Sequence, residues 1–565
     1  MQHNRSYDYV IAGAGSAGCA LAARLAEQAD VSVLLIEAGG SGRSLFATMP
    51  AGNGFIHGNP KYDWGFWSTP QEHLGGRRIY HPRGRGLGGS SLLNGMIYIR
   101  GNAADYDRWR QKGNVGWSFA DVLPYFRRSE GAAHRQGDPY HGSQGPLGVT
   151  PAGNFQEADQ RFVDACRQAG ALLNDDFNGQ RQVGAGRLDS KVAGGRRQSS
   201  AEAYLKRRPA NLHILTDTLV LGLELEGTRA VGVRLVDQTI RAEREVILCL
   251  GAFGSPQCLM LSGIGPADEI SAHGIAPVVD LPGVGRSLYD HPNMPMQFGM
   301  VDAELSLSRF QRIDRAIGMG LRYLLTRTGP GAGSFWSTGL FHALRDQDMP
   351  ELEVFCTPMI VREDSVGTEG WTIQRLLGLG NAFIARGKAA SPGMQFDVNL
   401  LRPESVGTVK LASSDPTTAP LIDPHYLEAP GDLEDLVAGV KHMREVARQA
   451  ALAEILGPEI TPGPGAVTDE EIAQAVKEEI TTGHHPTSTC RMGPDHDRDA
   501  VLDPELKVRG VDGLRVVDAS AFPDQISGNL NAPVMMMAEK AADVIRGLPV
   551  LAPEDPRPVA MEHAL

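Results

Sequence analysis

The chain has 565 residues, and its 67 acidic side chains outnumber its 54 basic ones, which gives a net charge of −13. This balance argues against a dedicated nucleic-acid binder, because such proteins present a basic surface. The length predicts about two to four folded units with a large buried core.

Six cysteines are spread along the chain, and none forms a C-x-x-C pair. This spacing predicts neither a disulfide framework nor a thiolate zinc site, and we expect no metal. The N-terminus reads as the start of a strand rather than as a signal peptide, and no apolar run is long enough to cross a membrane. We therefore expect a cytoplasmic protein, with peripheral contact to the inner membrane left open.

Residues 7–40 predict a β-α-β unit, because two apolar runs flank a helical pattern and the second run ends in Glu37. Gly13, Gly15 and Gly18 form a G-x-G-x-x-G pattern between the first strand and the helix. In such a unit the first glycine allows the tight turn, the second lets the backbone approach a diphosphate, and the third lets helix and strand pack closely. The pattern predicts a dinucleotide site.

The identity of the dinucleotide follows in part from Glu37, which stands nineteen residues after Gly18. An acid at this distance accepts hydrogen bonds from the ribose hydroxyls and disfavours the extra phosphate of NADP. NAD and FAD both remain open on this evidence, although a unit at the very start of a long chain is common in flavoproteins.

Four longer segments point to one family. They are HPRGRGLGGSSLLNGMIYIRG (81–101), GAFGSPQCLMLSGIG (251–265), GHHPTSTCRMG (483–493) and GLRVVDASAFPDQISGNLNAPVMMMAEKAADVIRG (513–547). In this order, and after the glycine pattern, they resemble the glucose–methanol–choline (GMC) oxidoreductases, most closely the choline-dehydrogenase-like and alcohol-dehydrogenase-like members. The resemblance covers nearly the whole chain.

The resemblance implies an α/β fold in which a discontinuous, Rossmann-like FAD-binding domain is joined to an α+β substrate domain with a mixed or antiparallel sheet. The expected FAD-binding domain comprises residues 1–155, 196–295 and 495–550, the substrate domain comprises 156–195 and 296–494, and a tail comprises 551–565.

The resemblance also assigns residues to FAD. They lie in the glycine loop, at the end of the second strand, in the Gly-Gly-Ser-Ser stretch, near the run TDTLVLGLEL, and around the start of the last helix. The assigned residues are Gly13, Gly15, Ser16, Gly18, Glu37, Ala38, Gly89, Ser90, Asn94, Gly95, Met96, Leu219, Asp518, Ala519, Asn531 and Pro533. Leu93 stands where some members attach FAD through a histidine, so we expect non-covalent FAD.

The catalytic residues are expected in two of the segments. Aligning the proline of GHHPTSTCRMG with the family motif makes His485 the base and places His484 in the wall of the substrate pocket. The second partner, histidine or asparagine in the family, is assigned to Asn531. A base with a near-neutral pKa takes the hydroxyl proton and an amide holds the oxygen, while hydride leaves to flavin N5.

The predicted function is oxidation of an alcohol, primary by preference, to an aldehyde in the manner of a choline dehydrogenase. The acceptor (a quinone, another carrier or O2), the alcohol and the oligomeric state stay open, and a dehydrogenase is favoured over an oxidase. Three alternatives remain: an aryl or aliphatic alcohol oxidase that releases H2O2, a light-driven fatty-acid decarboxylase of the same fold, and a flavin-binding protein without catalysis.

Two other interpretations of GHHPTSTCRMG are disfavoured. A zinc site of His484, His485 and Cys490 conflicts with the opposite directions of neighbouring side chains in extended chain. A serine hydrolase lacks a G-x-S-x-G elbow. Ser488 departs from the family, which usually has glycine there. The apolar segment 367–393 predicts an extra surface or core element, or alternatively a lid, a membrane contact or a subunit contact.

Overall fold

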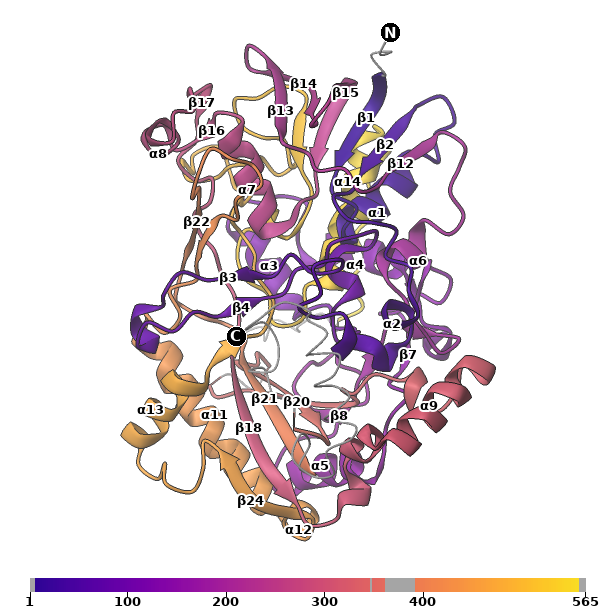
Figure 1. Cartoon of the computed structure of the whole chain (residues 1–565), viewed down its shortest axis with the longest axis vertical. Coiled ribbons are helices and arrows are strands. Elements are labelled where there is room, and N and C mark those ends of the chain that lie inside the picture. Colours follow the sequence, from indigo (N-terminus) through magenta and orange to yellow (C-terminus); the bar gives the residue numbers. More distant parts are fainter. Residues whose placement is uncertain (1–5, 346–347, 361–391, 558–565) are drawn as a thin grey trace, which may run out of the picture.

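The computed structural model describes residues 6–345, 348–360 and 392–557 (Figure 1). The segment 367–393 lies almost entirely outside this part of the chain, so its role stays a prediction. Within the described residues, no helix combines the length and the apolar character that crossing a membrane requires.

The first sheet is assembled from three separate stretches of the chain. At its centre β1 (Ser6–Ala12) lies between β2 (Val33–Ile36) and β15 (Thr239–Leu248), and both pairings are parallel. The outer strands are β12 (Leu212–Leu215), β13 (Gly222–Glu226), β14 (Arg229–Arg234) and β26 (Leu514–Val516). Because β1 is buried among parallel neighbours, its sequence is a continuous apolar run rather than an alternating one.

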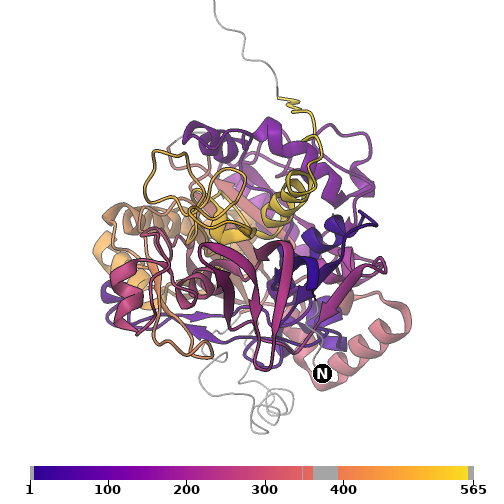
Figure 2. The same cartoon turned by 90° about the horizontal axis from the view of Figure 1, so that it is seen from above.

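Elements from the first and last parts of the described chain pack together beside this sheet. Helix α1 (Ser16–Leu25) follows β1 and packs against α14 (Asn531–Ile545), which also packs against α4 (Phe119–Ser129). Figure 2 shows the yellow C-terminal helix beside the indigo N-terminal elements. The predicted β-α-β unit is therefore confirmed, and the last helix of the chain lies next to its first.

The second sheet is antiparallel in every pair that the described residues form. Its central strands are β18 (Pro292–Met300), β21 (Gly393–Leu400) and β20 (Leu352–Thr357). The flanking strands are β8 (Gly184–Arg187), β19 (Thr338–His342), β24 (Leu456–Thr461) and β25 (Thr481–Thr482). Helices α5 (Glu157–Gln168) and α11 (Pro430–Arg448) pack against this sheet in the lower half of Figure 1. The predicted fold class is confirmed.

The sequence of β21, GMQFDVNL, explains the two faces of this sheet. Met394, Phe396 and Val398 belong to the hydrophobic core that also contains residues of α5 and α11. Successive side chains in a strand point to opposite faces, so the polar residues between them, such as Asp397, face away from this core. They line a cavity instead.

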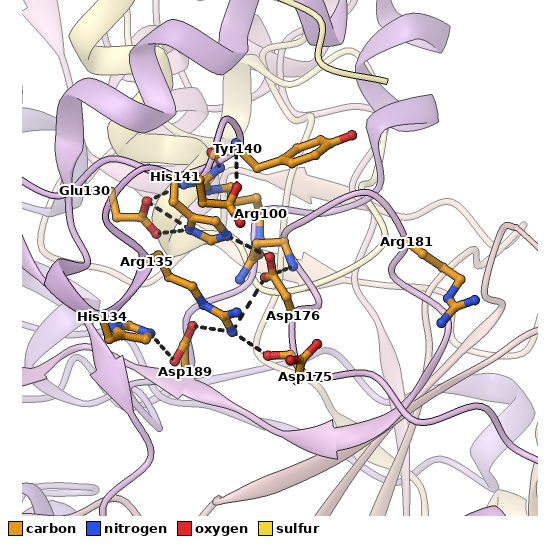
Figure 3. A network of polar contacts seen from close by, with 12 residues as sticks. Arg100, Glu130, His134, Arg135, Tyr140, His141, Asp175, Asp176, Arg181 and Asp189 are labelled. Atoms are coloured by element: carbon orange, nitrogen blue, oxygen red, sulfur yellow. Dashed lines mark hydrogen bonds and ion pairs between the residues drawn. The ribbon is translucent and has the colours of Figure 1, made fainter. Parts of the chain in front are cut away.

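A buried polar network joins the region after α4 to the segment that leads into the second sheet (Figure 3). Arg100 donates to Glu130 at 2.7 Å, and His141 contacts Glu130 at 3.0 Å and Asp176 at 2.9 Å. Burial alone would lower the pKa of His141, but the hydrogen bonds to Asp176 and Glu130 outweigh it and raise that pKa. The protonated imidazole can therefore bridge the two carboxylates and fix this connection.

The other elements connect or cover the two sheets. The helices are α2 (Leu45–Thr48), α3 (Ala103–Gln111), α6 (Ser200–Tyr204), α7 (Gly251–Leu261), α8 (Ala267–Ala272), α9 (Ile313–Thr326), α12 (Ala450–Ala453) and α13 (Asp469–Glu479). The short strands are β3 (Phe66–Trp67), β4 (Tyr80–His81), β5 (Glu130–Gly131), β6 (Leu147–Gly148), β7 (Thr150–Pro151), β9 (Asp189–Ser190), β10 (Val192–Ala193), β11 (Arg196–Arg197), β16 (Ile264–Gly265), β17 (Val279–Asp280), β22 (Thr408–Lys410) and β23 (Leu421–Asp423).

The predicted domain boundaries stay predictions, and two observations bear on where they would fall. Strand β18 begins at Pro292 and so runs across the expected boundary at 295. The backbone of 488–492 hydrogen-bonds to 519–521, so this segment packs with the first sheet although it was expected in the substrate domain.

Candidate active site

A continuous cavity of about 630 Å³ runs from the glycine loop after β1 to the polar face of the second sheet. It is lined by both histidines of GHHPTSTCRMG, His484 and His485. Of the residues assigned to FAD, those that line it are Gly13, Gly15, Ser16, Glu37, Ala38, Gly89, Ser90, Asn94, Gly95, Met96, Leu219, Asp518, Ala519 and Asn531. Gly18 and Pro533 are not in the lining.

The glycines form a cradle that larger residues would fill. Gly13 has φ +97°, and a Cβ there would lie 2.4 Å from the carbonyl oxygen of Cys249. A Cβ on Gly89 would lie 2.6 Å from the Cα of Gly15. Gly18 serves packing only, since a Cβ there would lie 1.9 Å from the oxygen of Gly13. The backbone at the start of α1 is thus open to a diphosphate, which helix N-termini bind well.

Glu37 organises this cradle. Its carboxylate accepts hydrogen bonds from the backbone N–H groups of Ala14 at 3.0 Å and of Gly39 and Gly86, both at 2.9 Å. Burial raises its pKa, and these three donors counteract that rise. A carboxylate has about four acceptor positions. One position therefore remains for a ligand hydroxyl, which agrees with the role assigned to Glu37.

Asp518 lines the cavity as expected, but its side chain is engaged by the protein itself. Its carboxylate accepts from the backbone of Gly251 and the hydroxyl of Ser255, and also from the backbone and hydroxyl of Ser520. These four donors fill its acceptor positions. Asp518 therefore fixes the start of α7 to the loop after β26, and any cofactor contact at 518–519 has to come from the backbone.

His485 is buried, and both its backbone and its ring make hydrogen bonds. Its backbone N–H donates to Asp290 at 2.7 Å, and its carbonyl oxygen accepts from Gln525 at 2.8 Å. The ring contacts His291 through Nδ1 at 2.9 Å and the amide nitrogen of Asn529 through Nε2 at 3.0 Å. The imidazole is therefore fixed in orientation before any substrate binds.

The hydrogen bonds also fix the tautomer of His485. Burial lowers the pKa of His291 to about 3, so this ring is neutral. Its Nε2 lies 3.0 Å from the carbonyl oxygen of Ile526, which can only accept, so Nε2 carries the proton and Nδ1 is an acceptor. His485 must then donate from Nδ1, which leaves the lone pair on Nε2.

Without a substrate this lone pair accepts a hydrogen bond from the amide N–H of Asn529, and a substrate hydroxyl would have to replace that contact to give up its proton. Burial, together with the nearby His291 and His484 rings, lowers the pKa of His485 well below its usual value. His485 is therefore neutral at pH 7, and its basic nitrogen lies at the cavity beside Asn529. The Oδ1 of Asn529 has no hydrogen-bond partner among the described residues. A substrate hydroxyl between the two side chains could donate to Nε2 of His485, while its oxygen accepts from the amide N–H of Asn529.

The prediction that Asn531 pairs with His485 is not met. The amide of Asn531 donates to the hydroxyl of Ser16 at 2.6 Å, and its oxygen accepts from Lys191. Asn531 is the first residue of α14, so the helix directs it toward α1, whereas Asn529 lies in the loop before the helix.

The other features of GHHPTSTCRMG serve the local backbone. His484 has φ +67° and Ser488 has φ +70°, a region that favours glycine, which accounts for the glycine usual in the family at the second position. Cys490 is buried in the core of the first sheet, where its backbone bonds to Ser520. His484 lines the cavity as predicted, and its Nδ1 has no partner among the described residues.

The wall opposite the glycine loop carries a carboxylate. Asp397 of β21 accepts from Gln395 at 2.6 Å and from the indole N–H of Trp336 at 3.3 Å. The Trp336 ring lies against Gly95, where an added Cβ would come within 3.0 Å of it. Phe355 is a further aromatic residue of this wall.

Comparison with known proteins identifies the family. The model of the GMC oxidoreductase N-terminal region matches residues 7–293, and that of the C-terminal region matches 403–538. The chain belongs to the GMC oxidoreductase family. The oxygen-dependent choline dehydrogenase of Brucella ovis is 40% identical over 561 residues, 98% of this chain and 97% of its own length. That of Photobacterium profundum is 38% identical, over 98% of this chain and 95% of its own length.

Solved structures with a similar fold support this family assignment. Pyridoxine 4-oxidase from Mesorbium loti superimposes with a TM-score of 0.83 at 29% identity, covering 96% of this chain and 99% of its own. Formate oxidase from Aspergillus oryzae RIB40 gives 0.85 at 27% identity, covering 97% and 99%. GMC oxidoreductases bind FAD and act on CH–OH groups, so the chain is an FAD-dependent oxidoreductase. The glycine cradle and the acceptor left on Glu37 fit this cofactor.

Three residues of the site were missed from the sequence. Asn529 stands two residues before the assigned Asn531 in Gly-Asn-Leu-Asn, so the motif itself contained the signal. His291 directly precedes β18 and contacts His485, and Asp397 belongs to β21 and lines the cavity. Only the packing of the second sheet brings them to the site, so no local pattern could have found them.

Replacing His291 tests the fixed tautomer. We expect His291→Leu to lower kcat about 10-fold to 100-fold, since the ring of His485 loses the acceptor that keeps its proton on Nδ1. His291→Gln should restore most of the rate, because its amide can still accept from His485 and donate to Ile526. Equal losses in both variants, measured by steady-state kinetics, would contradict the tautomer assignment.

Replacing the two asparagines separates their roles. Asn529→Ala should lower kcat/KM about 100-fold while FAD stays bound, because an amide at the reacting oxygen is lost. Asn531→Ala should instead weaken FAD retention, which is measured as flavin released on dilution. The reverse pattern would return the catalytic role to Asn531.

Proposed function

We propose that this chain oxidises a primary alcohol carrying a cationic group to the corresponding aldehyde, with His485 as the base and Asn529 as the amide that holds the oxygen. The observation that carries the proposal is the pairing of a fixed, neutral imidazole with an amide at 3.0 Å on the wall of the cavity.

His485 accepts the proton of the alcohol, and Asn529 orients its oxygen. The alcohol hydroxyl gives its proton to Nε2 of His485, while Asn529 keeps the oxygen in place by a hydrogen bond. The resulting imidazolium still donates from Nδ1 to His291, so the positive charge forms within an existing hydrogen bond. FAD, when bound, supplies the acceptor for the hydride that leaves the same carbon. The alcohol thus loses one proton and one hydride and becomes an aldehyde.

The cationic group is inferred from Asp397. This side chain is only 9% exposed, and no ion pair joins it to a basic residue in the described part of the chain. Burial raises its pKa, which reflects the cost of leaving this carboxylate uncompensated. A bound cation would remove that cost, and the faces of Trp336 and Phe355 attract cations. The two relatives named as choline dehydrogenases support such a substrate.

The electron acceptor and the state of FAD belong to the same proposal. We favour a dehydrogenase that passes electrons to a quinone or another carrier, with O2 as the competing acceptor. Leu93, which lines the cavity where a linking histidine would stand, supports non-covalent FAD. All six cysteines are free and buried, which supports a reducing compartment such as the cytoplasm.

Anaerobic reduction in the dark tests the reaction. The holoenzyme is mixed with choline, benzyl alcohol or a long-chain alcohol, and loss of the visible flavin absorbance is followed. Choline should bleach the flavin, and His485→Ala should slow bleaching about 10²-fold to 10⁴-fold because a general base is lost. If no alcohol bleaches the flavin, the proposed reaction is wrong, and fatty-acid decarboxylation under light is the reaction to test next.

The role of Asp397 is tested with two substrates of the same shape. Choline and its uncharged isostere 3,3-dimethylbutan-1-ol are compared in wild type and in Asp397→Asn. The ratio of their kcat/KM values should fall about 10-fold to 100-fold in the variant, because a buried charge contact is lost for choline alone. An unchanged ratio would reject the cation site while leaving alcohol oxidation intact.

A further inference from the structure

Lys191 is a buried lysine without an acidic partner among the described residues. It lies between β9 and β10, its side chain is only 1% exposed, and no ion pair joins it to an acid among the described residues. Its ammonium donates to the amide oxygen of Asn531 instead. Burial lowers the pKa of Lys191 well below its usual value, and a bound anion near it would offset that cost and favour the charged ammonium.

The acids and bases nearby do not supply the compensation. Asp189, two residues earlier, is held by His134 at 3.0 Å and by Arg135 at 3.5 Å (Figure 3). Arg197, also buried, adds a second positive charge close enough to lower the pKa of Lys191 further, after burial itself. Lys191 therefore lies in a region of positive potential.

Arg197 itself also lacks an acidic partner in the described chain. It donates to the carbonyl oxygen and the amide oxygen of Asn94, the latter at 3.1 Å, and to the amide oxygen of Asn53 at 3.1 Å. Both asparagines line the cavity. Two buried cations thus reach the same cavity through neutral amides.

From Lys191 each group donates a hydrogen bond to the next one, toward the cavity. Lys191 donates to the oxygen of Asn531, and the nitrogen of Asn531 donates to the hydroxyl of Ser16 at 2.6 Å. The hydroxyl hydrogen of Ser16 is then free to be donated onward. Ser16 is the first residue of α1 and lines the cavity beside Gly15. Donors in series polarise one another, so the chain presents a strengthened donor to the cavity.

We propose that Lys191 is a positioning residue for bound FAD. Its positive charge polarises the hydrogen bonds of Asn531 and Ser16 and so stabilises an anionic group of FAD at the start of α1. The fixed diphosphate and the reduced flavin ring are the two anionic groups that FAD offers. The proposal rests on FAD binding alone, so it does not depend on which alcohol is oxidised or on whether Asp397 binds a cation.

The test compares Lys191→Met with Lys206→Met in the full-length holoenzyme. Lys206 is an exposed lysine paired with Glu202, so its removal controls for the loss of one positive charge. Dissociation of FAD is measured as flavin fluorescence on serial dilution, and the midpoint potential of the bound flavin is measured with redox dyes. Lys191→Gln provides a second variant if the methionine variant does not fold.

The diphosphate and the reduced flavin predict different changes in the Kd for FAD and in the midpoint potential. If the diphosphate is the partner, the Kd for FAD should rise about 10-fold to 100-fold while the midpoint potential stays unchanged. If the reduced flavin is the partner, the potential should become more negative while oxidised FAD binds nearly as before. Lys191→Arg should preserve much of either effect. A Kd and a potential that both match those of Lys206→Met would overturn the proposal.

Discussion

The backbone carbonyl of Ile526 orients the proton of His291 and so determines which nitrogen of the candidate base is basic. It accepts from His291, and His291 in turn accepts from His485. Because the pKa of His291 is lowered to about 3, the ring cannot take a second proton and disturb this order. The rest of the fold serves this chain of contacts, since Ile526 follows the first sheet and His291 comes just before β18 of the second.

The cavity between the two sheets is electrically asymmetric. Buried cations, Lys191 and Arg197, reach it beside the first helix, whereas the unpaired carboxylate of Asp397 lies on the opposite wall. An anionic cofactor and a cationic substrate would each meet the opposite charge. The neutral imidazole of His485 and the amide of Asn529 belong to neither group, and they lie at the wall where the reacting atoms are proposed to meet.

The sequence predicted what depends on short-range geometry. The glycine loop and the acid at the end of β2 are as expected, because one short β-α-β unit places both of them. The assignment of the catalytic amide to Asn531 failed, because the directions of the Asn529 and Asn531 side chains depend on where helix α14 begins. His291, Asp397 and Lys191 depend on packing between distant segments, which no local pattern encodes.

The most direct test of the fixed base is the tautomer of His485 in the resting holoenzyme. Nitrogen-15 NMR of histidine-labelled protein distinguishes a protonated from an unprotonated ring nitrogen, and His485→Gln identifies the relevant signals. At pH 7 His485 should be neutral, with its proton on Nδ1 and an unprotonated Nε2. A ring that is charged, or that carries its proton on Nε2, would contradict the assignment of His485 as a base prepared by His291 and Ile526.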